Sequence, residues 1–290
     1  MHDGLILCRF VHFGAVLLLF GIRVFGLRFN MQRAGIENSP LALRLDRINL
    51  ALALVALVSA VAWLMLTAGS MAGDWRDALD PDTLALVLSS TFFGRVWIFH
   101  LALAVLVLLG AISTRRSAAA LHTVFLTLLL FTLAPVGHGA MFDGVQGQLL
   151  ILNQIIHLSG VGTWLGSLLM LALLLTPPQP LDIRQMLLRF SGIGYVLVAV
   201  IVATGLVNVR ALSGAFWPEP AFAGFGLVLA VKTAMVLAML LLAAANRTLA
   251  RGHSLNVQAL RVSVLLECTF GALALAAVSL LGTLPPMLMG

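Results

Sequence analysis

Residues 149–175, LLILNQIIHLSGVGTWLGSLLMLALLL, form a 27-residue run without a charged side chain. A helix rises about 1.5 Å per residue, so about 20 apolar residues cross the hydrocarbon core of a bilayer. The run is therefore predicted to be a membrane-spanning helix. It also carries Asn153, His157 and Trp164 at intervals of four and seven residues, which places all three on one helix face.

The whole chain has the composition of an integral membrane protein. Of its 290 residues, 61% are hydrophobic and 10% are charged, and a soluble domain of this size could not bury so much apolar surface. Breaks rich in proline, glycine and charge separate the apolar runs. We predict an all-α bundle of eight transmembrane helices in a single domain, residues 1–290, with spans at 5–29, 48–70, 92–112, 119–140, 149–175, 186–212, 222–246 and 257–284.

The basic residues alternate along the chain and predict the orientation. Loops rich in arginine tend to stay on the cytoplasmic side. The odd-numbered loops are therefore predicted to be cytoplasmic and both termini periplasmic, and the net charge of +6 is read as membrane anchoring and not as nucleic-acid binding. The arginines in or beside the odd loops are Arg28, Arg33, Arg44, Arg47, Arg115, Arg116, Arg184, Arg189, Arg247, Arg251 and Arg261.

Three histidines fall at one predicted depth. His12, His100 and His157 each lie about eight residues into a span that runs inward, or roughly 12 Å below the outer boundary. His138 lies near the outer end of the fourth span. One histidine on an apolar helix is usually a packing residue, but intramembrane ionisable groups commonly face a functional interior, and neutral imidazole binds transition metals. The group predicts a shared metal or cofactor site.

Other polar side chains are candidates to support this site. Cys8 precedes His12 by four residues and is either a soft ligand or a small buried residue, and Arg9 either reaches the lipid headgroups or lies beside the site. Lys232 and Glu267 lie inside the seventh and eighth spans at different depths, which argues against a direct ion pair. Glu267 is a candidate to carry a proton or pass on a cation.

Methionines at the predicted outer face point to the identity of the metal. Met141 lies beside His138, and Met287 and Met289 form an M-x-M pair near the C-terminus. Thioethers select soft cations, above all Cu(I), whereas the bundle lacks the carboxylate cluster that hard cations require. We predict a copper site with the ligand candidates His12, His100, His138, His157, Met141, Met287 and Met289.

Several motifs give the chain a resemblance to the copper resistance protein D (CopD) family of bacterial inner-membrane proteins. They are RFVHF at 9–13, GHGAM at 137–141, NQIIHLSGVGTWLGSLL at 153–169, RFSGIGYVLVAVIVATGLVN at 189–208, and Lys232 followed by Asn246-Arg247. The resemblance implies copper transport from periplasm to cytoplasm, not an enzyme, together with a separate periplasmic CopC-like copper-binding protein. It assigns His12, His138, His157 and Trp164 to motifs, whereas His100 rests on its depth.

Two other functions remain open from the sequence. Histidines on neighbouring helices could ligate a b-type haem, which would make the protein a membrane cytochrome or cupric reductase. The chain could also be a scaffold that supports a periplasmic metallochaperone. The sequence carries no P-loop motif, so a transporter would depend on the membrane potential, a proton gradient or a copper sink.

Overall fold

The computed structural model describes residues 1–29, 40–113, 119–136, 142–176, 183–218, 220, 222–251 and 256–283, without the side chains of residues 183, 185 and 191. Its elements are α1 (His2–Arg28), α2 (Pro40–Ala72), α3 (Pro81–Ser90), α4 (Phe92–Ile112), α5 (Ala119–Phe131), η3 (Ala134–Val136), α6 (Gly144–Leu174), α7 (Ile183–Ser213), α8 (Gly224–Arg251) and α9 (Val257–Leu281). Within these ranges, eight helical segments are long and apolar enough to cross a membrane, as predicted.

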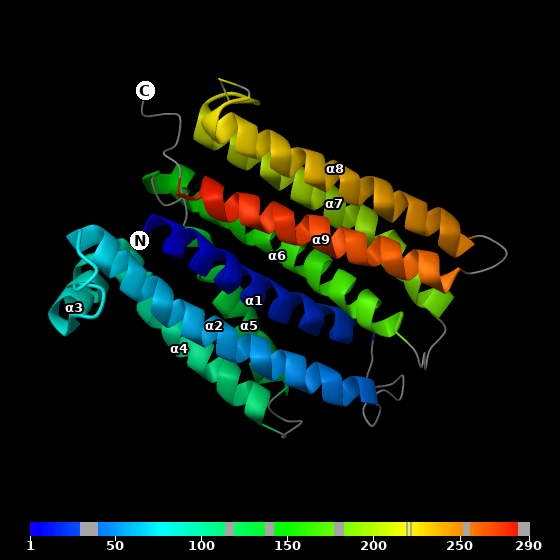
Figure 1. Ribbon diagram of the computed structural model, residues 1–290, viewed down its shortest axis with the longest axis horizontal. Helices are drawn as coiled ribbons and strands as arrows, with labels where there is room; N and C mark the ends of the chain where they lie inside the picture. The colour runs from blue at the N-terminus through cyan, green and yellow to red at the C-terminus, as the bar shows by residue number, and fades with distance from the viewer. Residues whose placement is uncertain are drawn as a thin grey trace.

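Helix α1 lies at the centre of the bundle (Figure 1). It contacts α2 and α5 on one side and α6 and α9 on the other. Figure 1 shows α2 and α4 beyond one side of α1, and α7 and α8 beyond α6 and α9 on the opposite side. Helix α1 begins and α9 ends at the same end of the bundle, which we call the termini end.

Most of the described interior lies in two large packed regions that meet along α1 and α6. The first is formed mainly by α1, α2, α4 and α5, with Trp97 and Leu17 among its fully buried residues. The second joins α6, α7, α8 and α9 to the far end of α1. A small third cluster joins α8 and α9 at Phe225, Leu229 and Leu281. Large apolar side chains also cover the outside, for example Phe99 at 68% exposure and Leu241 at 73%. Such an exterior suits contact with lipid, because lipid tails are as apolar as these side chains.

The fourth span differs from the predicted continuous helix over 119–140. Helix α5 ends at Phe131, and a short 3₁₀ turn follows at Ala134–Val136. Pro135 explains the break because proline has no N–H to donate to the carbonyl of residue 131, and its ring clashes there. The early end of α5 leaves Thr132 in a turn outside the helix, where its hydroxyl reaches the first packed region.

Helix α3 was not predicted from the sequence, because residues 81–90 are too few to span a membrane. It begins at an N-cap, where the Asp80 carboxylate accepts hydrogen bonds from the backbone N–H and the hydroxyl of Thr83 at 2.8 and 2.7 Å. These bonds hold the pKa of Asp80 below its ordinary value.

We expect Asp80→Ala to fray the first turn of α3, because the Thr83 N–H loses its acceptor. Faster hydrogen exchange at the Thr83 and Leu84 amides would report the fraying. In the unsubstituted protein the cap is at full strength above the usual pKa range of aspartate, and it is lost as the pH falls through the lowered pKa of Asp80. Unchanged exchange in the variant would contradict this role.

Candidate functional site: a buried histidine pair and a cationic cavity

His12 of α1 and His100 of α4 meet in the first packed region. Their Nε2 atoms lie 2.9 Å apart, and neither ring is exposed. Each outer ring nitrogen contacts a hydroxyl: Nδ1 of His12 lies 2.9 Å from Oγ of Ser59, and Nδ1 of His100 lies 2.7 Å from Oγ1 of Thr132. The two imidazoles therefore join four segments of the chain, α1, α2, α4 and the turn after α5.

The hydroxyl groups determine how protons are arranged along this chain of contacts. Ser59 donates its single proton to the carbonyl of Val55 at 2.5 Å, so Nδ1 of His12 donates to Ser59. Thr132 likewise donates its single proton to the carbonyl of Leu129 at 2.8 Å, so Nδ1 of His100 donates to Thr132. In two neutral rings both Nε2 atoms are then lone pairs, and they face each other across 2.9 Å.

Two tryptophans enclose the histidine pair. Trp97 stacks on His100 with ring centroids 4.5 Å apart and an interplanar angle of 14°, and its indole N–H donates to the carbonyl of Ala60 at 2.9 Å. Trp63 meets His12 edge-on at 5.6 Å. These contacts orient both rings before any metal binds, which lowers the cost of assembling a site.

The geometry of the pair suits a small soft cation better than a haem. Bonds of about 2 Å from each imidazole would require Nε2 atoms about 3.3 Å apart at a tetrahedral angle and about 4 Å apart in a linear complex. The observed 2.9 Å spacing therefore needs an opening of roughly 1 Å or less. A porphyrin does not fit between rings that are already in direct contact.

Cys8 and Arg9 flank the pair without joining it. The Cys8 thiol donates to the carbonyl of Ser59 at 3.2 Å, so it shares a neighbour with His12. Arg9 donates from Nη1 to the carbonyl of Gly282 at 2.8 Å and lies with Cζ 5.3 Å from the Trp63 ring centroid. Within the described ranges, no three His, Cys, Asp or Glu side chains are grouped closely enough to hold one metal ion.

His157 occupies a different place, which corrects the expectation of one site shared by three histidines. Its Nδ1 lies 2.8 Å from Oγ1 of Thr204 on α7, and it lines a cavity that His12 and His100 do not line. Asn153, one turn away, donates to the Thr204 carbonyl and to Oδ1 of Asn208, both at 2.9 Å. Equal depth was predicted from residue counts, but α6 turns this face towards α7 and away from α2 and α4.

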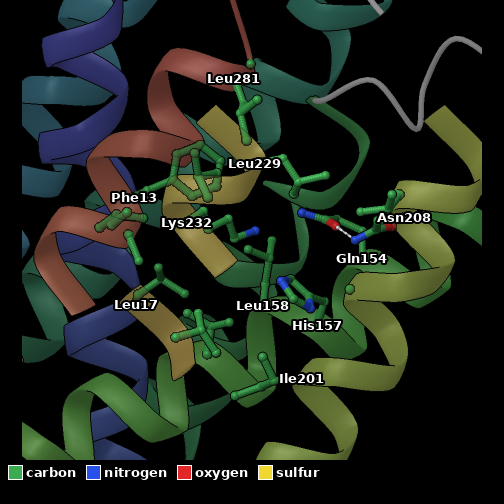
Figure 2. Close-up of a pocket in the computed structure, with 18 of the residues that line it drawn as sticks. Phe13, Leu17, Gln154, His157, Leu158, Ile201, Asn208, Leu229, Lys232 and Leu281 are labelled. Carbon is green, nitrogen blue, oxygen red and sulfur yellow. Dashed lines mark hydrogen bonds between the residues drawn. The ribbon is translucent and has the colours of Figure 1, made fainter. Parts of the chain in front are cut away.

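The remaining supporting residues lie in different places in the bundle. Lys232 lines the cavity with His157 (Figure 2). Trp164 is also among the lining residues. Glu267 is buried at 2% exposure in α9, where it accepts a short hydrogen bond from Nδ2 of Asn246. No ion pair joins Lys232 to Glu267, both of which the structure describes. The candidate ligands His138, Met141, Met287 and Met289 lie outside the described residues.

Sequence reasoning missed the partners that position the histidines. Ser59, Trp63 and Trp97 are buried around the pair. Thr132 contacts Nδ1 of His100. One signal was available: Trp97 precedes His100 by three residues and so shares its helix face. Thr204 and Asn208 on α7 likewise lie one helical turn apart, opposite His157 and Asn153.

Comparisons with known proteins match both halves of the chain to one family. Residues 1–148 match the model for the copper resistance protein D-like N-terminal domain, and residues 184–281 match the model for copper resistance protein D. The inner membrane protein YebZ of Escherichia coli (strain K12) is 30% identical over 96% of this chain and 97% of its own length.

Two relatives carry copper in their names. Copper resistance protein D of Pseudomonas syringae pv. tomato is 31% identical over 99% of this chain and 98% of its own length. The copper transport protein CutJ of Bacillus subtilis (strain 168) is 29% identical over 64% of this chain and 36% of its own length. No solved structure matches the chain.

Proposed function

Because the chain belongs to the copper resistance protein D family, we propose that it carries copper across the bacterial inner membrane and that His12 and His100 are its Cu(I) ligands. The observation that carries this proposal is the 2.9 Å contact between the two Nε2 atoms. Two neutral rings present facing Nε2 lone pairs at this contact, and a soft monovalent cation satisfies that arrangement. Eight apolar spans and the relative named as an inner membrane protein support the location.

The surroundings of the pair favour Cu(I) over harder metals. Imidazole is a good ligand for copper and zinc, whereas structural zinc needs four ligands and magnesium or calcium needs several oxygens. The structure offers two nitrogen donors, with the Trp63 and Trp97 ring systems on the sides. Aromatic faces attract cations, and a two-donor site with little else around it suits a soft ion that accepts few ligands.

His157 is not part of this copper site in our proposal. It lines a cavity together with Lys232, whose ammonium would repel a copper ion there. His138, Met141, Met287 and Met289 are proposed to receive copper at the periplasmic mouth, on the strength of their ligand types and predicted positions. A separate CopC-like protein is proposed as the donor.

We propose inward transport, with both termini periplasmic. One positive charge moving through the membrane potential gains about 2.3 kcal/mol per 100 mV, so the potential itself can assist import. Glu267 is the candidate for the inward part of the route, because it is a buried carboxyl near the middle of α9, farther from the termini end than the α9 residues that line the cavity. Glu267→Gln with unchanged transport would remove it from the route.

The proposal is tested by elemental analysis and an absorption spectrum of the purified protein loaded with Cu(I). We expect copper in the unsubstituted protein and at least a 10-fold loss of affinity, by order of magnitude, in the single variants His12→Ala and His100→Ala, because each removes one of two ligands. His122→Ala is the matched control, since His122 lies on α5 and contacts the carbonyl of Val107 instead.

Each alternative function has a distinct outcome in the same experiment. Unchanged copper in the double variant His12→Ala/His100→Ala would contradict the proposed ligands. Copper binding that survives replacement of His12, His100 and His157 together would favour the scaffold. A haem absorption band in the purified protein would favour the membrane cytochrome or reductase.

A further inference from the structure

A cavity of about 260 Å³ lies among α6, α7, α8 and α9, beside α1 (Figure 2). It extends from the termini end, at Leu281, to about the middle of α8 and α9, at Met239 and Gly271. Most of its walls are aliphatic side chains, including Leu158, Ile201 and Leu229. A molecule that occupied this space would therefore be largely apolar.

Within the described part of the chain, the charged side chains that line the cavity are two cations. Lys232 extends into it from α8 (Figure 2). Arg9 of α1 also lines it. Among the residues that the structure describes, no carboxylate lines the cavity and none forms a hydrogen bond or ion pair with Lys232. An ammonium in an apolar interior is unfavourable unless an anion or other acceptor is near. The cavity thus offers positive charge and lacks the negative charge to balance it.

The neutral polar groups add further donors. Asn153 donates to Asn208, and Nδ2 of Asn208 donates to Oε1 of Gln154 at 2.8 Å. Because Gln154 accepts through Oε1, its amide NH₂ group is left to donate to another partner. Figure 2 shows this group directed towards Lys232. Nε of Arg9 and the indole N–H of Trp164 are buried donors without a partner.

From these observations we infer that the cavity binds an amphiphilic acid, a single carboxylate or phosphate group carried on an apolar chain. The anionic oxygens pair with the ammonium of Lys232 and the amide of Gln154, and the chain lies along the aliphatic walls. A metal cation is repelled by Lys232 and Arg9. A small hydrophilic anion would be dehydrated there with no apolar contact to offset the cost. This site is separate from the proposed copper pair.

The test measures binding of radiolabelled palmitate to the delipidated, full-length protein in a neutral detergent without copper. We expect saturable binding that falls at least about 10-fold in Lys232→Met, because the anion would then be buried without its partner. Lys232→Arg should stay within about 3-fold of the unsubstituted protein, since it retains the charge. Arg251→Met removes an exposed cation from the same helix and should leave binding unchanged.

Competing ligands separate the charge, the chain and the source of the ligand. Methyl palmitate has the same chain without the charge and should fail to compete, and acetate has the charge without the chain and should also fail. Competition by phosphatidylglycerol stronger than by palmitate supports the class and identifies a phospholipid as the source. Competition by palmitate and not by phosphatidylglycerol identifies a free fatty acid.

Three results would overturn the inference: no saturable palmitate binding, unchanged binding in Lys232→Met, or equal competition by methyl palmitate or acetate. If Lys232→Met does not fold, two measurements still test the inference: palmitate binding to Gln154→Leu, and competition by methyl palmitate for the unsubstituted protein. Cu(I) affinity is measured on the same preparations, so failure of the acid site and failure of the copper proposal are distinguishable.

Discussion

Gly166→Ala is expected to destabilise the bundle by about 3 kcal/mol or more, at the upper end of what overpacking of an interior costs. Helices α1 and α6 cross with Gly21 against Gly166, and a Cβ on Gly166 would overlap the Cα and carbonyl carbon of Gly21 and lie 2.6 Å from the backbone nitrogen of Ile22. These neighbours are backbone atoms, so no side chain can rotate away. The two helices would have to separate, and small residues at such crossings are what allow membrane helices to approach closely.

The matched control is Gly26→Ala on α1. A Cβ at Gly26 meets no atom within 4 Å, and alanine is the better helix former by up to about 1 kcal/mol. The thermal unfolding midpoint and the monodisperse fraction in detergent should therefore fall for Gly166→Ala and hold or rise for Gly26→Ala. Equal midpoints for the two variants would contradict the importance of the α1–α6 crossing.

Most of the fold follows from hydropathy alone, because a span has to be long, apolar and bounded by charge or helix breakers. Two features of the fold do not follow from hydropathy. Pro135 was visible in the sequence, and its steric effect ends α5 at Phe131, but hydropathy continues past it. Helix α3 is short, and its Asp80 cap and the proline after it were the signals that could have revealed it. The orientation of the termini and the single domain over 1–290 stay predictions.

The sequence predicts only part of the candidate site. Residue counts give depth, which places His12, His100 and His157 at one level, but they do not give rotation about each helix axis. Rotation depends on which helices become neighbours, and the chain places His12 against Ser59 and His100 while placing His157 against Thr204. Hydroxyl partners of this kind are common in apolar helices, so their sequence signal is weak.

Trp97→Ala is expected to cost about 3–5 kcal/mol of folding free energy, the range for removing a large buried aromatic side chain. Trp97 is fully buried, packs on Phe93 and Trp63, and stacks on His100 at 4.5 Å. Its loss leaves a cavity beside His100 and removes the surface that holds the imidazole in place. We therefore expect Cu(I) affinity to fall by about 10-fold as well, as for other residues that orient a ligand.

Trp75→Ala removes the same side chain at a position that is 57% exposed, and it should change stability by no more than about 0.5 kcal/mol. Trp97→Phe separates the two effects, because a phenyl ring can keep stacking on His100 while the hydrogen bond to Ala60 is lost. It should retain most of the Cu(I) affinity with a smaller loss of stability. Full copper affinity in Trp97→Ala would show that the histidine pair is positioned by Ser59 and Thr132 alone, and that the tryptophan serves packing only.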